Sequence, residues 1–277
     1  MLAKTRHLSP ISTGAMQLVS LLGQPETSNE KVIEIIKQDS VLTAKLLCAC
    51  NSPALGLKAP IASVDHAVLV LGHSHILRTV TALAFRGPLD VPLLGYSLGA
   101  KALWHHSLTA AVAAEMAVAS GLSVGLDSST AFTIGLLHDF GKLVTTQFLA
   151  RQALVAARER FTQGRSSVEA EREVLGTDHA EVGAAVLDLW RLPAQIVEAV
   201  ALHHQPVFTP QPRSSALAWF ANQIAHQTEA ARSGQQPRAS GIDARIVDLG
   251  FSPEQLEDLI GRASQAFQEV NQQLLAA

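Results

Sequence analysis

Hydrophobic positions recur every three or four residues through most of this chain, which is the spacing of one buried face of an α-helix. We find no run of alternating polar and apolar residues bounded by turn residues, the pattern of a strand. Capping boxes at Thr27, Ser166 and Asp178 mark helix starts. The sequence therefore predicts an all-α fold. Besides a helix after Thr27, the expected helical segments are 41–50, 64–71, 73–85, 97–120, 129–138, 142–158, 166–176, 178–190, 193–204, 214–230 and 253–275.

The helices divide into two lobes at a segment rich in Gly, Pro and Asp, between Arg86 and Gly95. We expect an N-terminal helical lobe over 1–90 and a second helical lobe over 91–231. A polar loop and an amphipathic helix follow over 232–277. This last helix could pack on its own domain or on a second chain, and the oligomeric state stays open.

Composition narrows the classes of function. Hydrophobic residues make up 48% of the 277 positions and charged residues 16%, which is enough apolar material for a core. A net charge of -3 argues against a nucleic-acid partner. We see no signal-peptide pattern and no apolar stretch of membrane-spanning length, so we expect no membrane association and a cytoplasmic protein. Cys48 and Cys50 lack a zinc-binding spacing and indicate free thiols in a reducing compartment.

The candidate chemistry centres on the adjacent pair His138-Asp139, at the end of an apolar helical run. Neutral imidazole and carboxylate are both ligands for divalent metals. Asp139 could instead pair only with Lys142, three residues later. Ligands from separate helices can meet in the core of a bundle. The candidate metal ligands are His106, His138, Asp139, His179, His203 and His204.

Two of these candidates belong to pairs of adjacent histidines. Neighbouring side chains on a helix point about 100° apart, so we expect only one of His105 and His106 to face a shared pocket. The same holds for His203 and His204, unless the helix frays there. The remaining histidines are expected to be solvated or partly buried without a site; they are His7, His66, His73, His75 and His226.

Several segments resemble a known family. The run from Gly135 to Lys142 resembles the signature of HD-type metal-dependent phosphohydrolases, with Phe140 where Ile is usual. Other blocks are similar to the HDOD family: Gln38–Leu47, Asn51–Pro53, Ile61–Val68, Leu71–Gly72 and Leu103–Ser107. The resemblance covers roughly Leu8 to Gln205. It implies an all-helical protein with a role in bacterial signalling or regulation, in a family whose catalytic residues are often lost.

The resemblance also implies roles for single residues. His106 matches the first histidine of the HD superfamily, and His138-Asp139 matches the pair that names it. The segment 178–183 resembles the part of HD-GYP phosphodiesterases that supplies a further histidine, His179 here. His203-His204 resembles their paired histidines, and Glu173 lies where they often have an acid.

Two departures from the HD-GYP pattern weigh against cyclic di-GMP hydrolysis. The Gly-Tyr-Pro element that follows the paired histidines is absent, because residues 205–210 read Gln-Pro-Val-Phe-Thr-Pro. HD enzymes also close the site with a late aspartate, and the nearest aligned position here is Asn222. An amide oxygen is neutral and cannot supply the negative charge of a carboxylate.

Several functions stay open. In the first, the protein is a regulatory module that binds a signalling protein or a small signalling ligand. The alternative is a phosphohydrolase acting on a nucleotide or cyclic dinucleotide, with one or two divalent ions of Fe, Mn, Mg, Ni or Zn. Lys142 and Asp139 would then be catalytic, Lys142 by stabilising charge or protonating a leaving oxygen. A third alternative is a bound metal with a structural or sensing role. The protein could also bind no metal.

Overall fold

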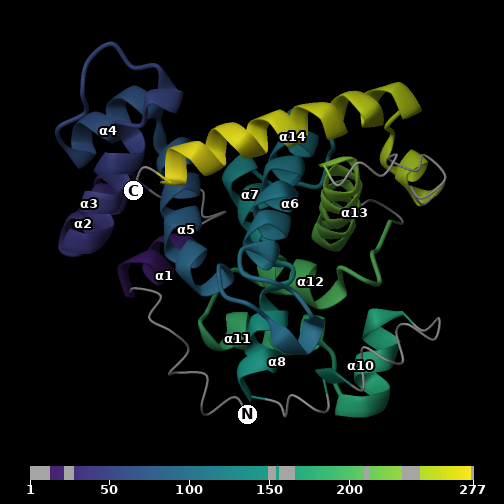
Figure 1. The fold of residues 1–277 in the computed structure, drawn as a ribbon. Helices are drawn as coiled ribbons and strands as arrows, with labels where there is room; N and C mark the ends of the chain where they lie inside the picture. The colour runs from purple at the N-terminus through teal and green to yellow at the C-terminus, as the bar shows by residue number, and fades with distance from the viewer. Residues whose placement is uncertain are drawn as a thin grey trace.

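The computed structural model describes residues 13–21, 28–148, 154–155, 166–208, 213–232 and 244–275. Helices form two lobes, and a long C-terminal helix lies across both (Figure 1). No strand occurs in these ranges; the one isolated bridge joins Leu93 and Leu98. The all-α prediction is confirmed.

In the described part of the N-terminal lobe there are five helices, and local capping fixes most of their ends. Ser63 caps the fourth helix and Gly72 ends it, which gives the predicted range 64–71. The second helix is capped by Ser28, whose hydroxyl accepts from the Lys31 amide, and the predicted cap Thr27 lies outside the described residues. The helices are α1 (Thr13–Ser20), α2 (Asn29–Gln38), α3 (Ser40–Cys50), α4 (Val64–Leu71) and α5 (His73–Leu89), with the 3-10 turn η2 (Pro53–Leu55) after α3.

Two predicted boundaries near the lobe junction are wrong. Helix α5 does not end at the expected residue 85 but continues to Leu89, because Pro88 in the last turn costs few helical hydrogen bonds and Leu89 is fully buried. Helix α6 (Ala102–Ala119) begins later than residue 97, after the turn η3 (Leu94–Tyr96). Ser97 and Lys101 have positive φ angles of 51° and 69°, which no helix accepts.

The second lobe contains the remaining helices of the bundle, and α6 packs against two of them, α7 and α13. Helix α7 ends at Leu137 and α8 starts at Phe140, so the break falls at His138-Asp139, between the expected segments 129–138 and 142–158. The predicted continuation beyond residue 148 falls largely outside the described residues. The helices are α7 (Ser128–Leu137), α8 (Phe140–Phe148), α10 (Ser167–Leu175), α11 (His179–Leu189), α12 (Ala194–Leu202) and α13 (Ser214–Arg232).

Small residues let the site-bearing helices approach closely. A Cβ atom on Gly135 of α7 would lie 2.4 Å from the Ala110 carbonyl oxygen of α6, so only glycine fits. The capping box of Ser166 with Glu169 forms as predicted. Asp178 caps α11, but the Glu181 side chain binds the Thr177 hydroxyl instead of completing a box. These contacts fix the ends of α7 and α11, where the candidate ligands lie.

The final helix, α14 (Pro253–Leu275), packs on its own chain, against α6, α13, α5 and α3. It follows the 3-10 turn η5 (Ala244–Leu249). The Trp104 indole donates to Asn271 at 3.1 Å, and Arg86 donates to the Leu274 carbonyl. Among the described helices, none alone has the length and hydropathy of a membrane span; α4 and α5 pass that test only as a pair, bent by 120°.

Candidate metal centre

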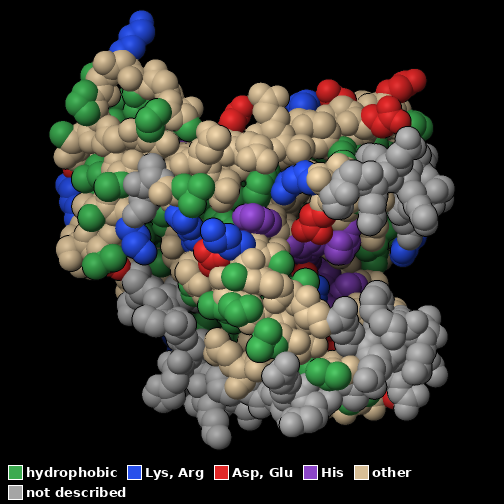
Figure 2. Space-filling model, in the orientation of Figure 1, with side chains coloured by type: hydrophobic (Ala, Val, Ile, Leu, Met, Phe, Trp, Pro, Cys, Tyr) green, Lys and Arg blue, Asp and Glu red, His purple; other side chains and the backbone are tan. Residues whose placement is uncertain are grey.

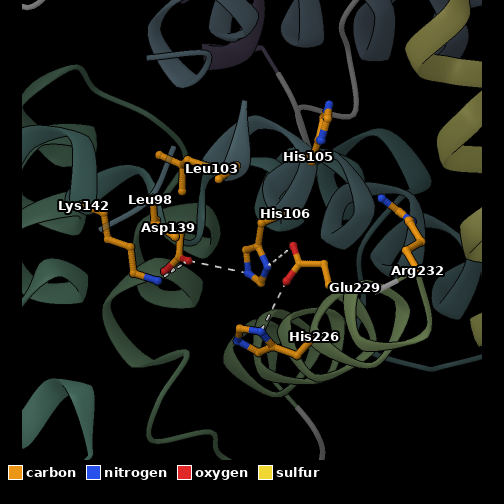
Figure 3. A pocket seen from close by; sticks show the side chains of 10 residues that line it. Leu98, Leu103, His105, His106, Asp139, Lys142, His226, Glu229 and Arg232 are labelled. Carbon is orange, nitrogen blue, oxygen red and sulfur yellow. Dashed lines mark hydrogen bonds and ion pairs between the residues drawn. The ribbon is translucent and has the colours of Figure 1, made fainter. Parts of the chain in front are cut away.

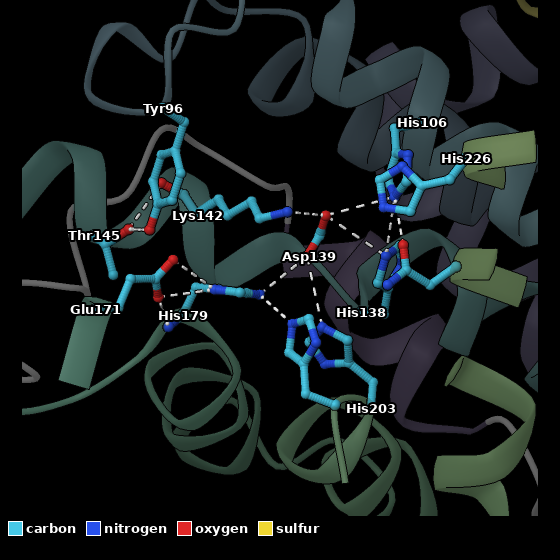
Figure 4. A network of polar contacts seen from close by, with 12 residues as sticks. Tyr96, His106, His138, Asp139, Lys142, Thr145, Glu171, His179, His203 and His226 are labelled. Atoms are coloured by element: carbon cyan, nitrogen blue, oxygen red, sulfur yellow. Dashed lines mark hydrogen bonds and ion pairs between the residues drawn. The ribbon is translucent and has the colours of Figure 1, made fainter. Parts of the chain in front are cut away.

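The six predicted ligands meet in one cluster (Figure 4). They come from four places: the second turn of α6, the break between α7 and α8, the start of α11 and the end of α12. His138, His179 and His203 are fully buried. The structure thus brings together residues that are nearly a hundred positions apart in the sequence.

Asp139 lies at the centre of the cluster, with one carboxylate oxygen facing each pair of histidines. Its Oδ2 atom is 3.6 Å from the Nε2 atoms of both His106 and His138. Its Oδ1 atom is 3.3 Å from Nε2 of His179 and 3.6 Å from Nε2 of His203. The cluster therefore has two halves that share one carboxylate.

The outer nitrogen of each of these four rings faces an oxygen that can only accept a hydrogen bond. Nδ1 of His138 lies 2.8 Å from the Gly135 carbonyl, and Nδ1 of His203 lies 2.8 Å from the Val200 carbonyl. The corresponding partners of His106 and His179 are carboxylates, Glu229 at 3.0 Å and Glu171 at 2.8 Å. Each Nδ1 therefore carries a proton, and the Nε2 side is directed at Asp139. Histidines that bind metals are oriented in this way.

Both members of the His203-His204 pair enter the cluster. Nε2 of His204 lies 3.0 Å from Nε2 of His179, and α12 ends at Leu202, just before the pair. The helix end is what allows both rings to face inward, which is the exception that the sequence left open. At the other pair His106 is in the cluster, and His105 lies at its rim, edge-on to Phe267.

Burial and charge set the protonation of these groups. Burial lowers the pKa of His138, His203 and His204. Burial alone would raise the pKa of Asp139, but the charges of Lys142 and His138 hold it well below its usual value. His179 differs, because the Glu171 carboxylate outweighs burial and raises its pKa to about 9.

Two buried atoms of the cluster indicate that it could hold a cation. Asp139 Oδ1 and His203 Nε2 are buried and have no hydrogen-bond partner among the described residues. An unpaired buried acceptor is costly, and a cation between these atoms would satisfy both. Imidazole nitrogen with one carboxylate suits Zn, Fe, Mn or Ni better than Mg. The residues present therefore fit a divalent transition metal in each half: His106, His138 and Asp139 in one, and Asp139, His179, His203 and His204 in the other.

Three groups around the cluster were not predicted from the sequence. Glu171, and not Glu173, is the acid that contacts His179; Glu173 is exposed. Glu229 and His226 lie on α13 near His106, although His226 was expected to be a lone histidine. Their spacing of three residues on the helix that carries Asn222 was the available signal.

The position aligned with the late aspartate of HD enzymes also faces the cluster. Asn222 is buried on α13, and its Oδ1 atom lies 3.1 Å from Nε2 of His106. Its place agrees with the alignment made from the sequence. It gives the His106 half a neutral oxygen where a carboxylate would bring a negative charge.

A pocket of about 460 Å³ opens beside the cluster (Figure 3). Its polar wall includes Lys142, whose Nζ atom is 2.5 Å from Asp139 Oδ2, as the spacing predicted. Figure 2 shows histidine side chains at the surface in the middle of one face, flanked by basic and acidic groups. The lining residues are Leu98, Ala102, Leu103, His105, His106, Asp139, Lys142, His226, Glu229 and Arg232.

A family model, that of the HDOD domain, matches residues 8–206. The chain belongs to the HDOD domain family. Its fold matches that of a protein from Shewanella amazonensis SB2B named "Putative phosphohydrolase", with a TM-score of 0.73 and 20% identity over 99% of this chain and 97% of that one. An HDOD protein of unknown function from Geobacter sulfurreducens has a TM-score of 0.65 and 23% identity, covering 94% and 84%.

A second S. amazonensis protein, named "Putative metal-dependent phosphohydrolase", is 20% identical with a TM-score of 0.59, covering 96% of this chain and 92% of that one. At these identities the likeness extends to the fold alone. An uncharacterized protein of Treponema pallidum (strain Nichols) is 26% identical over 75% of this HDOD chain. The matched region is 40% of that relative's length. The chain is therefore an HDOD protein that shares the helical fold of these solved structures.

Proposed function

We propose that this HDOD protein holds a two-metal centre and hydrolyses a phosphate ester in the pocket beside it. The observation that carries the proposal is the orientation of four histidine rings around Asp139. Each has its Nδ1 proton fixed by an acceptor and its Nε2 atom directed inward. A cluster kept only as packing would not need the same tautomer four times.

The protein's own groups would hold the ions and place the substrate. Bound divalent ions would supply Lewis-acid polarisation of a phosphoryl oxygen. Lys142 is held by Asp139 and lines the pocket, so its ammonium group can contact a phosphoryl oxygen or protonate the leaving oxygen. Leu98 and Leu103 give the pocket an apolar wall for the ester's organic part.

A direct test compares the wild-type protein, prepared without a histidine tag, with Asp139→Asn and Lys142→Ala. Each is loaded with Mn²⁺ or Fe²⁺ and assayed on phosphomonoesters, phosphodiesters and cyclic dinucleotides. Asp139→Asn should lose metal and turnover together. Lys142→Ala should keep its metal and lose turnover by a factor of about 100 or more. Metal-loaded wild type with no turnover on any of these substrates contradicts the hydrolase assignment.

The second candidate is a regulatory module that binds a small signalling ligand or a partner protein without hydrolysis. Asn222 favours it, because one inner carboxylate, Asp139, must then balance the charge of any bound metal. The same pocket would then bind an anion at Lys142 and Arg232. Under this assignment the metal-loaded protein binds a nucleotide stably, and Arg232→Ala weakens binding without any product appearing.

A further inference from the structure

The inner ligands are poor in negative charge for a centre that binds two divalent ions. Asp139 is the single carboxylate among the six predicted ligands, and Asn222 adds a neutral oxygen to the His106 half. Charge buried with little compensation is costly. A second source of negative charge near His106 would therefore matter for metal affinity.

Glu229 lies where such a charge is needed. It stands two turns after Asn222 on α13, and its Oε1 atom is 3.0 Å from Nδ1 of His106. Its Oε2 atom is 3.6 Å from Nδ1 of His226, so two imidazoles flank the carboxylate (Figure 3). In the other half, Glu171 makes the same contact with Nδ1 of His179. Each half of the centre thus has one outer carboxylate behind one of its histidines.

We propose that Glu229 is a positioning residue that replaces, one layer further out, the carboxylate that Asn222 lacks. It fixes the Nδ1 proton of His106, directs Nε2 towards the metal position and makes the ring a stronger donor. This inference rests on the proposed two-metal centre. It assigns the two outer carboxylates separately, Glu229 to the His106 half and Glu171 to the His179 half.

The same three residues, His106, His226 and Glu229, could instead be read as a separate metal site, since their ligand atoms lie close together. His106 argues against this. Its Nε2 side already faces His138 and Asp139, so a metal on Nδ1 as well would require removal of the ring's last proton. A positioning role uses both nitrogens without that cost.

The test measures metal affinity by competition titration, with Co²⁺ absorption as the spectroscopic readout, on tag-free protein. Glu229→Gln keeps the shape and removes the charge; Glu171→Gln is the matched variant in the other half. Each variant should bind one of the two ions about 10- to 100-fold more weakly and bind the other with unchanged affinity. The two variants should alter different parts of the Co²⁺ spectrum, which a general loss of folding would not do.

A rescue experiment distinguishes a role for the charge of Glu229 from a role in packing alone. Asn222→Asp should restore affinity in the Glu229→Gln background, because it returns a carboxylate to the same half. It should not rescue Glu171→Gln. Melting temperatures of the metal-free proteins check that each variant folds, and Glu229→Ala provides a second variant that removes the acceptor altogether.

Four results would overturn the inference. Two metals bound with unchanged affinity in both Glu229 variants would overturn it while leaving the proposed function standing. So would failure of Asn222→Asp to rescue, or a third metal equivalent that is lost in His226→Gln. Wild-type protein that binds no metal would overturn the inference and the proposed function together.

Discussion

At the scale of single residues, the tautomers of the histidines are the most informative feature. Four rings present Nε2 to one carboxylate, and two carbonyls and two carboxylates hold their Nδ1 protons. The sequence predicted His106 and His203 as ligands from their alignment. It could not predict the contact of Glu171 with His179, because that contact depends on how α10 meets α11 and not on spacing.

Metal binding should release a proton from His179. In the metal-free protein the Glu171 carboxylate raises the pKa of this ring to about 9, so the ring is protonated at pH 7.5. A metal ion on Nε2 takes the place of that proton. We therefore expect about one proton released per centre, measured by titration calorimetry in buffers of different ionisation enthalpy.

The affinity for metal should therefore depend on pH. Metal affinity should rise as pH increases from about 6.5 to 9 and level off above it, because fewer protons compete. Glu171→Gln should lower the pKa of His179 and remove most of the proton release near pH 7.5. Unchanged release in this variant would contradict the assigned role of Glu171.

At the scale of helices, local signals predicted the elements well and their contacts poorly. The predicted ranges 64–71 and 166–176 agree closely with α4 and α10, because their ends are fixed by caps between neighbours in the sequence: Ser63 and Gly72 for α4, Ser166 and Gly176 for α10. The start of α6 was misplaced because the positive φ at Lys101 has no sequence signature. Convergence of ligands depends on close helix contacts, of which α8 against α11 is the tightest at the site.

Gly141 of α8 controls that contact. A Cβ atom there would lie 1.7 Å from the His179 carbonyl oxygen, so Gly141→Ala must push α11 away. We expect a loss of about 3 kcal/mol in the free energy of unfolding, together with weaker metal binding through His179. Denaturant titration measures the first effect. Gly261→Ala, on the open face of α14, is the control and should stabilise by about 0.5–1 kcal/mol.

The contact between α5 and α14 should become less stable as the pH falls. His75 lies between Arg78 of α5 and Gln273 of α14, and burial with the Arg78 charge lowers its pKa to about 4. The unfolded chain therefore takes up a proton near pH 6.5 that the folded chain refuses, so stability falls as pH drops from 6.5 to 4. His75→Gln should reduce this fall by about 2 kcal/mol, as followed by denaturant titration at each pH. If the free energy of unfolding fell equally steeply with decreasing pH in wild type and in His75→Gln, the role assigned to His75 would be wrong.

At the scale of the whole molecule, the ligands of the metal centre come from α6, the α7–α8 break, α11 and the end of α12, all in one lobe, and α14 lies across both lobes (Figure 1). The family assignment from sequence blocks was confirmed because those blocks are spread along the chain. Whether the protein hydrolyses or only binds its ligand could not be predicted from sequence, because it depends on charge around Asn222 and on the pocket.

Bound metal should stabilise the second lobe, because the ligands come together only in the folded chain. At metal concentrations about 100-fold above the dissociation constant, binding adds about 2.7 kcal/mol. A chelator should therefore lower the melting temperature by about 5 °C or more. His66→Ala, outside the cluster, should melt with the same chelator-induced shift as wild type.

The most direct test of the two-metal centre is the metal content of tag-free protein after loading and desalting. We predict about two equivalents in wild type, about one in His138→Ala and in His203→Ala, and close to none in Asp139→Asn, since Asp139 serves both halves. Wild-type protein that retains less than about a tenth of an equivalent, or an Asp139→Asn variant that retains both, would contradict the account.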